Sequence, residues 1–193
     1  MVKSLTMGRF LVAASVALTA AACSGGNPAN SDLQSKGGGT LTVQSDQFKE
    51  GQPIPVKNSA NGGDISPSIS WSAPPAGTKS LALIVDDSDA KGFVHWIVFN
   101  IPPDTNSLPA GLPQTDWLNQ LKGKVLQGKN GQDSTGYFGP RPPAGMPHHY
   151  HFHVYALDST LDLNGGASRA DVEKAMSNHV LAQGELTGTF ESK

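Results

Sequence analysis

The chain has 193 residues, of which 37% are hydrophobic, and its 14 basic and 16 acidic residues give a net charge of −2 at pH 7. This slightly acidic balance argues against a nucleic-acid-binding protein, which needs a basic face, and against attachment to an anionic membrane by charge alone. Once the amino-terminal segment is set aside, the length suits one domain with a single sizeable core.

Residues 1–22 predict an export signal. Lys3 and Arg9 form a basic start, and an apolar stretch of small residues follows over residues 10–22. The stretch is too short to span a bilayer comfortably, so we expect it to be exported and cut. Its removal deletes two of the 14 basic residues and none of the 16 acidic ones, which leaves a mature net charge of about −4.

Cys23 is the only cysteine, so an intrachain disulfide is excluded. Its place directly after three alanines looks like a bacterial lipobox, in which the thiol receives a diacylglycerol and anchors the protein to the cell membrane. Ala20 departs from that motif, which prefers leucine there. The same Ala-x-Ala would also serve an ordinary signal peptidase and leave a secreted, soluble product. The lone cysteine at this position favours the lipoprotein.

Residues 23–40 predict a flexible tether that follows the lipidated cysteine. After Cys23 they are small and polar, with one isolated leucine. Such a segment buries too little apolar surface to order itself. We therefore expect one folded domain over residues 41–193, without an internal repeat or a second domain.

Four segments of that domain have strand patterns. Residues 41–48 alternate at their start, and residues 81–85 form a continuous apolar run of strand length. Residues 93–101 are apolar on both parities, as in a strand covered on both faces, and residues 148–157 alternate. The domain is predicted to be mostly strand.

One segment near the end predicts a helix. Ser168 can cap it with Asp171 three residues on, and Gly184 is expected to end it before a last strand over residues 185–190. The apolar or packing positions have helical spacing: Val172, Ala175, Met176 and His179.

Asp87 and Asp89 directly follow the apolar run 81–85. In an extended segment they would share one face, while Asp86 points the other way. Acids at a strand end more often cap a turn, so a site role is an alternative that these residues alone do not favour.

His95 opens the apolar segment 93–101 and is expected to share a face with Phe93, Ile97 and Phe99. A lone histidine on such a face is more often a core residue than a ligand group. The connection from Asp89 is only six residues, however, which is short enough to bring His95 back beside the acids. A carboxylate there would hold the imidazole protonated, or at least oriented, as a donor for an anion.

Pro142 and Pro143 fix the backbone between Gly139 and Gly145, which predicts a stiff pocket wall. An ordinary surface loop has a similar composition, but it does not explain the whole Gly-Pro-x-Pro-Pro-x-Gly string.

His148 and Tyr150 lie two apart on one strand face, where both can donate hydrogen bonds to a phosphoryl or carboxylate oxygen. His149, His151 and His153 alternate on the opposite face, at a spacing that could ligate zinc. A solvated strand face is favoured, because no acid or cysteine is forced nearby, and no metal is expected. His179 is interpreted as a packing residue of the helix.

Four motifs follow one another along the domain: Asp87-x-Asp89-Ala90, His95 before an apolar run, Gly139-Pro140-x-Pro142-Pro143, and His148-x-Tyr150. Together they resemble the signature of the phosphatidylethanolamine-binding protein (PEBP) family, in its bacterial Raf-kinase-inhibitor-like branch. Further matches to the family are Ile54-Pro55, Asp64-Ile65-Ser66-Pro67, Trp71, Gly77-Thr78-Lys79-Ser80-Leu81, Tyr155-Ala156-Leu157-Asp158, His179-Val180-Leu181-Ala182 and Glu185-Leu186-x-Gly188.

The resemblance implies a mainly β fold, with a central β-sandwich and a few peripheral helices. The chain departs from the family at Ser88 and Lys91, where prolines are usual, so this loop is expected to be less rigid. Arg141 stands where relatives often carry a small residue or cysteine, and it either adds a cation to the site or points to solvent. The resemblance implies these ligand-binding residues: Asp87, Asp89, His95, Pro142, Pro143, His148 and Tyr150.

Three functions remain open at this point. The first is an envelope binding module whose pocket takes a small anion or a phosphorylated headgroup, with no cofactor. The second is an interaction protein that inhibits an envelope or secreted enzyme. The third, a hydrolase, is disfavoured because no Gly-x-Ser-x-Gly motif is present and Cys23 is consumed by export.

Overall fold

The computed structural model describes Met1, Leu33 and residues 36–193. The predicted signal segment and Cys23 therefore lie outside the described residues. Within them, the structure contains no helix long and apolar enough to cross a membrane.

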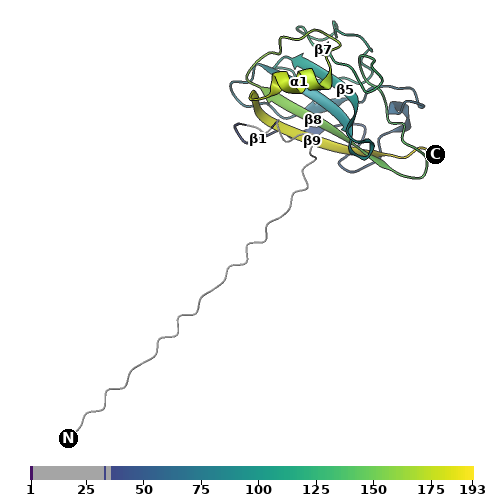
Figure 1. The fold of residues 1–193 in the computed structure, drawn as a ribbon, viewed down its shortest axis with the longest axis horizontal. Helices are drawn as coiled ribbons and strands as arrows, with labels where there is room; N and C mark the ends of the chain where they lie inside the picture. Colours follow the sequence, from purple (N-terminus) through teal and green to yellow (C-terminus); the bar gives the residue numbers. More distant parts are fainter. Residues whose placement is uncertain (2–32, 34–35) are drawn as a thin grey trace.

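Two β-sheets pack face to face (Figure 1). The larger has six strands in the order β1-β9-β8-β4-β5-β7, and the smaller has three in the order β2-β3-β6. The bounds are β1 Gly39–Thr40, β2 Val43–Gln44, β3 Ile69–Trp71, β4 Ser80–Asp87, β5 Phe93–Ile101, β6 Ser107–Leu108, β7 Leu126–Gln127, β8 His148–Leu157 and β9 Val180–Phe190. The mainly β sandwich that the family resemblance implies is thus confirmed.

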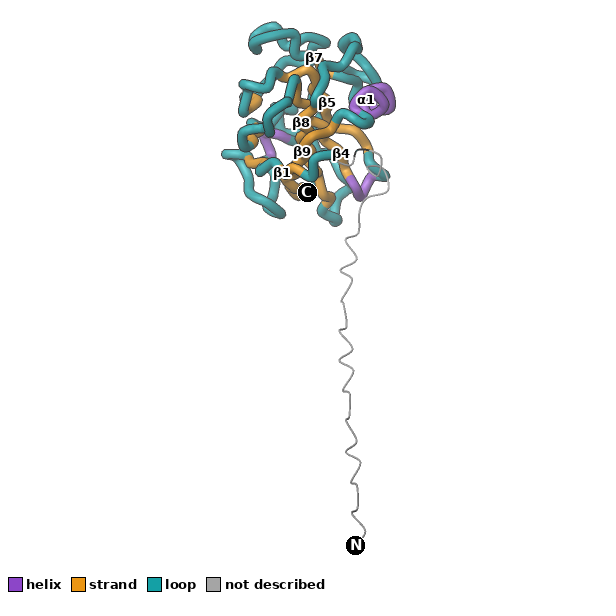
Figure 2. Tube along the Cα trace, turned by 90° about the vertical axis from the view of Figure 1, so that its left-hand side faces the viewer, coloured by secondary structure: helices purple, strands orange, loops and turns teal. Residues whose placement is uncertain are grey.

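Helical structure is sparser than the family resemblance implies, and it agrees with the single helix that local sequence patterns predict. The described part of the chain holds one α-helix, α1 (Arg169–Met176), where a few peripheral helices were expected. Two other helical segments are single 3₁₀ turns, η2 (Val56–Asn58) and η3 (Ser88–Ala90). Figure 2 shows α1 beside the strand layers and the loops that make up much of the outer surface.

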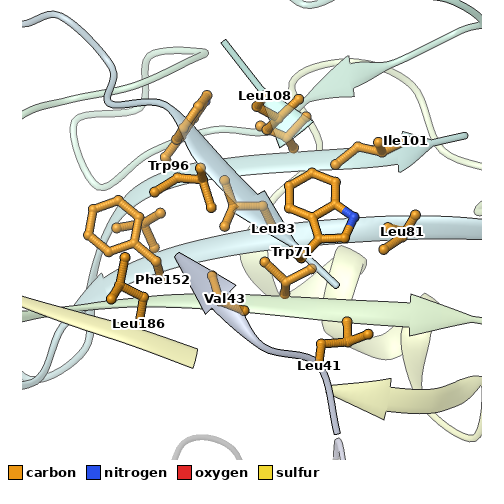
Figure 3. Packing of buried hydrophobic residues seen from close by; sticks show 14 of the residues in the cluster. Leu41, Val43, Trp71, Leu81, Leu83, Trp96, Ile101, Leu108, Phe152 and Leu186 are labelled. Atoms are coloured by element: carbon orange, nitrogen blue, oxygen red, sulfur yellow. The ribbon is translucent and has the colours of Figure 1, made fainter. Parts of the chain in front are cut away.

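The larger sheet is buried on both faces. Its inner face packs against the smaller sheet in an inter-sheet core that includes Leu83, Phe152 and Leu186, with Val43 and Trp71 opposite (Figure 3). Its outer face packs against α1 in a helix-side core, where Ile84, Ile97, Val172 and Met176 meet. Burial on both sides explains why β4 and β5 are almost continuously apolar. Each fully buried aliphatic side chain stabilises the fold by about 1.5–3 kcal/mol.

The predicted start of the helix is correct, and its predicted end is wrong. Ser168 Oγ accepts a hydrogen bond from the Asp171 backbone N–H at 3.2 Å, which caps the first turn. The helix ends at Met176, and Gly184 lies inside β9 instead of terminating the helix. Glycine is needed there because a Cβ would lie 2.0 Å from the backbone oxygen of Leu41. His179 is not a helix residue, and its Nδ1 bonds Asp158 Oδ1 at 2.6 Å.

Part of the predicted tether contacts the folded body. β1 pairs in parallel with β9, and the Lys36 backbone N–H donates to the Val180 oxygen at 2.9 Å. The isolated Leu33 is 3% exposed and belongs to the helix-side core. The prediction of a flexible tether is therefore wrong for Leu33 and residues 36–40. Leu33 packs in the helix-side core, and residues 36–40 are held by backbone hydrogen bonds to β9.

Candidate functional site

A bulge in β5 places His95. Asp86 pairs with Val94 and Val85 pairs with Trp96, so His95 is an extra residue without a partner on β4. The bulge breaks the alternation that the sequence suggested. His95 stays on the side of Phe93, whereas Ile97 and Phe99 belong to the helix-side core.

Beside this bulge lies a small cavity of about 170 Å³. Six of the seven predicted binding residues line it: Asp87, His95, Pro142, Pro143, His148 and Tyr150. Five lining residues were not predicted from the sequence as binding residues: Ala90, Phe93, Gln132, Phe138 and Arg141. Phe138 directly precedes the Gly-Pro motif and could have been found there, whereas no local pattern singles out Gln132.

Asp89 is the predicted residue that does not line the cavity. Its Oδ2 accepts hydrogen bonds from the backbone N–H and the Nδ1–H of His149, both at 2.8 Å. It therefore ties η3 to the outer side of β8. The alternation rule fails here because η3 begins directly after Asp87 and turns the chain out of the extended conformation.

Asp87 is buried and holds two parts of the site together. Its Oδ1 accepts from the backbone N–H groups of Asp89 and Ala90 at 2.9 and 3.1 Å, which caps η3. Its Oδ2 accepts from His148 Nδ1–H at 2.7 Å. Both carboxylate oxygens are thus engaged, and Asp87 orients His148 instead of meeting a ligand with a free oxygen.

His95 is 4% exposed and differs from its expected state. Its Nδ1 lies 2.6 Å from the Phe138 carbonyl oxygen, and its ring stacks on the Phe138 ring. Burial lowers the pKa of His95, and the Phe138 bond and the Asp87 charge only partly oppose that shift. The expectation of a carboxylate-stabilised cation is therefore wrong, because desolvation exceeds the attraction of the acid.

The hydroxyl group of Tyr150 makes no hydrogen bond of ordinary length and angle within the described part of the protein. The residue is 1% exposed, and its Oη is buried without a hydrogen-bond partner among the described residues. Burial raises the pKa of Tyr150 above its ordinary value, and so do the charge of Asp87 and the approach of its carboxylate to the hydroxyl, so the hydroxyl keeps its proton. The ring meets His95 edge to face, with 5.0 Å between centroids.

Arg141 supplies a cation at the mouth of the cavity. Its guanidinium carbon lies 5.5 Å from the centre of the Phe138 ring, within cation–π range. The side chain lines the cavity although the residue is exposed. The geometry thus favours the first of the two alternatives that the sequence left open.

On the opposite face of the sheet, six side chains form a charge network: Asp86, His151, His153, Arg169, Glu173 and Glu185. His153 lies between Asp86 and Glu185, at 3.5 and 3.2 Å, and Arg169 Nη1 meets Asp86 Oδ2 at 2.8 Å. Cross-strand pairing brings them together, because His151 faces Asp86 and His153 faces Glu185.

The favoured interpretation of this face as solvated holds for His149, whose side chain is 50% exposed, and is wrong for His151 and His153, which pair with acids from neighbouring strands. Burial disfavours a charged His153, but hydrogen bonds to Asp86 and Glu185 outweigh it and raise the pKa of His153 to about 9. The hydrogen bond to Glu185 also raises the pKa of His151. No group of acids and histidines in the described residues is suited to hold a metal ion.

Comparison with known proteins identifies the family. The family model described as "Phosphatidylethanolamine-binding protein" matches residues 44–191. The chain belongs to this family. It is 42% identical over 152 residues to a UPF0098 protein of Methanothermobacter thermautotrophicus, covering 78% of this chain and 98% of that one.

Two further PEBP relatives resemble the chain. It is 41% identical to LppC of Mycobacterium tuberculosis, named as a candidate lipoprotein, over 78% of this chain and 72% of that one. The crystal structure of E. coli YbcL, titled a new member of the mammalian PEBP family, matches this structure with a TM-score of 0.72 and 34% sequence identity. That match covers 79% of this chain and 99% of YbcL.

Proposed function

We propose that this PEBP-family protein binds a small anion or a phosphorylated group in the cavity beside His95. Tyr150 is the observation that carries the proposal, because the residue lines the cavity and its hydroxyl is buried without a hydrogen-bond partner in the described structure. An unsatisfied buried hydroxyl costs about 1–3 kcal/mol. A ligand oxygen that accepts a hydrogen bond from the Tyr150 hydroxyl would recover that free energy.

The size and charge of the cavity support an anion. A volume of about 170 Å³ admits a headgroup or an inorganic anion but not a whole lipid. Arg141 brings positive charge to the mouth, and Asp87 holds His148 so that its ring borders the cavity.

The lining residues favour binding over catalysis. Among the described residues that border the cavity there is no serine, threonine, cysteine or lysine to act as a nucleophile. Both oxygens of the Asp87 carboxylate are occupied by hydrogen bonds. These features support a site that holds a ligand and leaves it unchanged.

We also propose that the domain works at the bacterial envelope, anchored through a lipid on Cys23. The lipobox-like sequence and the name of the mycobacterial relative support this location. The Cys23→Ser precursor should move from the membrane fraction to the soluble fraction, because it lacks the acyl acceptor. A variant that fractionates like the wild type would exclude lipid anchoring.

Calorimetric titration with inorganic phosphate tests the binding function. Tyr150→Phe should weaken phosphate binding by about 10- to 100-fold, since a hydrogen bond to a charged group contributes about 1.5–3 kcal/mol. Tyr155→Phe is the matched control, because Tyr155 lies on the same strand but in the helix-side core. Failure of the wild type to bind phosphate, or equal effects of the two substitutions, would contradict the proposal.

A further inference from the structure

The proton of His95 is placed by its partner. Nδ1 lies 2.6 Å from the Phe138 carbonyl oxygen, and a carbonyl can only accept a hydrogen bond. The proton of a neutral His95 therefore sits on Nδ1, and Nε2 carries a lone pair. Burial lowers the pKa of His95, which keeps the ring in this neutral form.

The free nitrogen borders the cavity. No hydrogen bond to His95 Nε2 exists in the described part of the chain, and His95 lines the cavity beside Tyr150. The two rings meet edge to face with 5.0 Å between centroids, so one small ligand can touch both. Two residues that line the cavity side by side thus supply an acceptor, His95 Nε2, and a donor, Tyr150 Oη–H.

Resting on the proposed function, we propose that the cavity selects an anion that carries its own proton, with hydrogen phosphate as the simplest member of the class. Its P–O–H group donates to His95 Nε2, while an ionised oxygen accepts from Tyr150 Oη–H. A phosphomonoester in its singly ionised form offers the same pair of groups. No proton is transferred in this arrangement, and no bond breaks.

A fully ionised oxyanion fits the same space less well. Its oxygens can accept from Tyr150 and from Arg141, but at His95 an oxygen lone pair of the anion meets the lone pair of Nε2. The acids around His95 do not relieve this conflict. Asp87 is committed to η3 and His148, and Asp64 accepts from the Gly139 backbone N–H at 2.6 Å.

Phosphate and sulfate distinguish the two cases, because both are tetrahedral and similar in size. At pH 7 both ionisation states of inorganic phosphate carry a proton, whereas sulfate carries none. We expect the wild type to bind phosphate at least about tenfold more tightly than sulfate in calorimetric titrations at one pH and ionic strength, the lower bound for a hydrogen bond to a charged group.

Two variants assign the preference to His95. In His95→Gln the side-chain amide can donate as well as accept, so the phosphate-to-sulfate ratio should fall toward one. Tyr150→Phe is the control, because its lost donor serves both anions. It should weaken both and leave their ratio unchanged.

The outcomes separate this inference from the proposed function. Equal binding of phosphate and sulfate by the wild type would overturn the proton-dependent selection and leave the anion site standing. Binding of neither anion would overturn both proposals. If His95→Gln does not fold, the comparison of the two anions in the wild type still decides the question.

Discussion

The two faces of the larger sheet place the same residue type in opposite electrostatic conditions. On the cavity face, burial lowers the pKa of His95, whose ring meets the Tyr150 ring edge to face. On the network face, against the effect of burial, the buried Asp86 and the exposed Glu185 raise the pKa of His153 to about 9. The difference shows that burial alone does not decide the charge of a histidine. It is decided by whether a carboxylate hydrogen bonds directly to the ring.

The comparison also separates two uses of acids. Asp87 accepts hydrogen bonds from η3 with one carboxylate oxygen and from His148 with the other, and it thereby positions two parts of the cavity wall. Asp86, its neighbour in sequence, points to the other face and pairs with Arg169 and His153. We therefore expect changes on the network face to reduce stability without reducing anion affinity, and changes on the cavity face to affect affinity.

The largest expected effect comes from Arg169→Met. The substitution leaves Asp86, which is 1% exposed, with His153 as its remaining ionic partner. Breaking a buried ion pair typically costs about 3–5 kcal/mol. Chemical denaturation should show a loss of that size, while phosphate affinity stays within about twofold of the wild type.

Lys174→Met is the matched control, since Lys174 is exposed on the same helix. Should Arg169→Met be no less stable than this control, the network would not contribute to the stability of the fold.

The next effect is a loss of stability at alkaline pH. The pKa of His153 is about 9 in the folded protein and about 6.5 in an unfolded chain, so its contribution is complete below 6.5 and disappears as pH rises through 9. The shift corresponds to about 3 kcal/mol. Denaturation midpoints measured from pH 6 to pH 10 should fall, and His153→Gln should remove most of this slope. A slope that persists in His153→Gln would assign it to another group.

His95 should produce a smaller effect of opposite sign. Because its folded pKa lies below the unfolded value of about 6.5, its contribution is complete above 6.5 and is lost as pH falls through the folded pKa. NMR titration of the histidine ring signals should show His95 titrating below, and His153 above, the ordinary value. Titration of both on the same side would break the comparison between the two faces.

The smallest effect is expected for His149→Gln. The His149 side chain is 50% exposed, and its pair with Asp89 contributes about 0.2–1 kcal/mol. Asp89 also keeps its bond from the His149 backbone N–H. Stability should change by less than 1 kcal/mol and phosphate affinity should not change. A large loss of affinity would show that Asp89 supports the cavity through His149.

Local patterns predicted the strands, and the family resemblance implied most of the residues that line the cavity. The continuous apolar runs of β4 and β5 follow from burial on both faces, and alternation correctly separated His148 and Tyr150 from His149 and His151. Alternation failed at His95, because a bulge adds one residue that no local signal announces. It failed again at Asp89, because the chain leaves the extended conformation after Asp87 and Asp89 lies in the 3₁₀ turn η3.

By itself, the sequence determined that the domain is mostly strand, since burial on one or two faces imposes a hydrophobic period on each strand, and its family motifs carried the β-sandwich and the residue types of the site. Only the tertiary structure decided which groups meet and in which charge state. The Phe138 carbonyl that places the His95 proton is 43 residues away along the chain, and Glu185, which helps to hold a proton on His153, lies on the next strand. The pKa of a side chain depends on such neighbours and on the water they exclude, and both exist only once the sheets have packed.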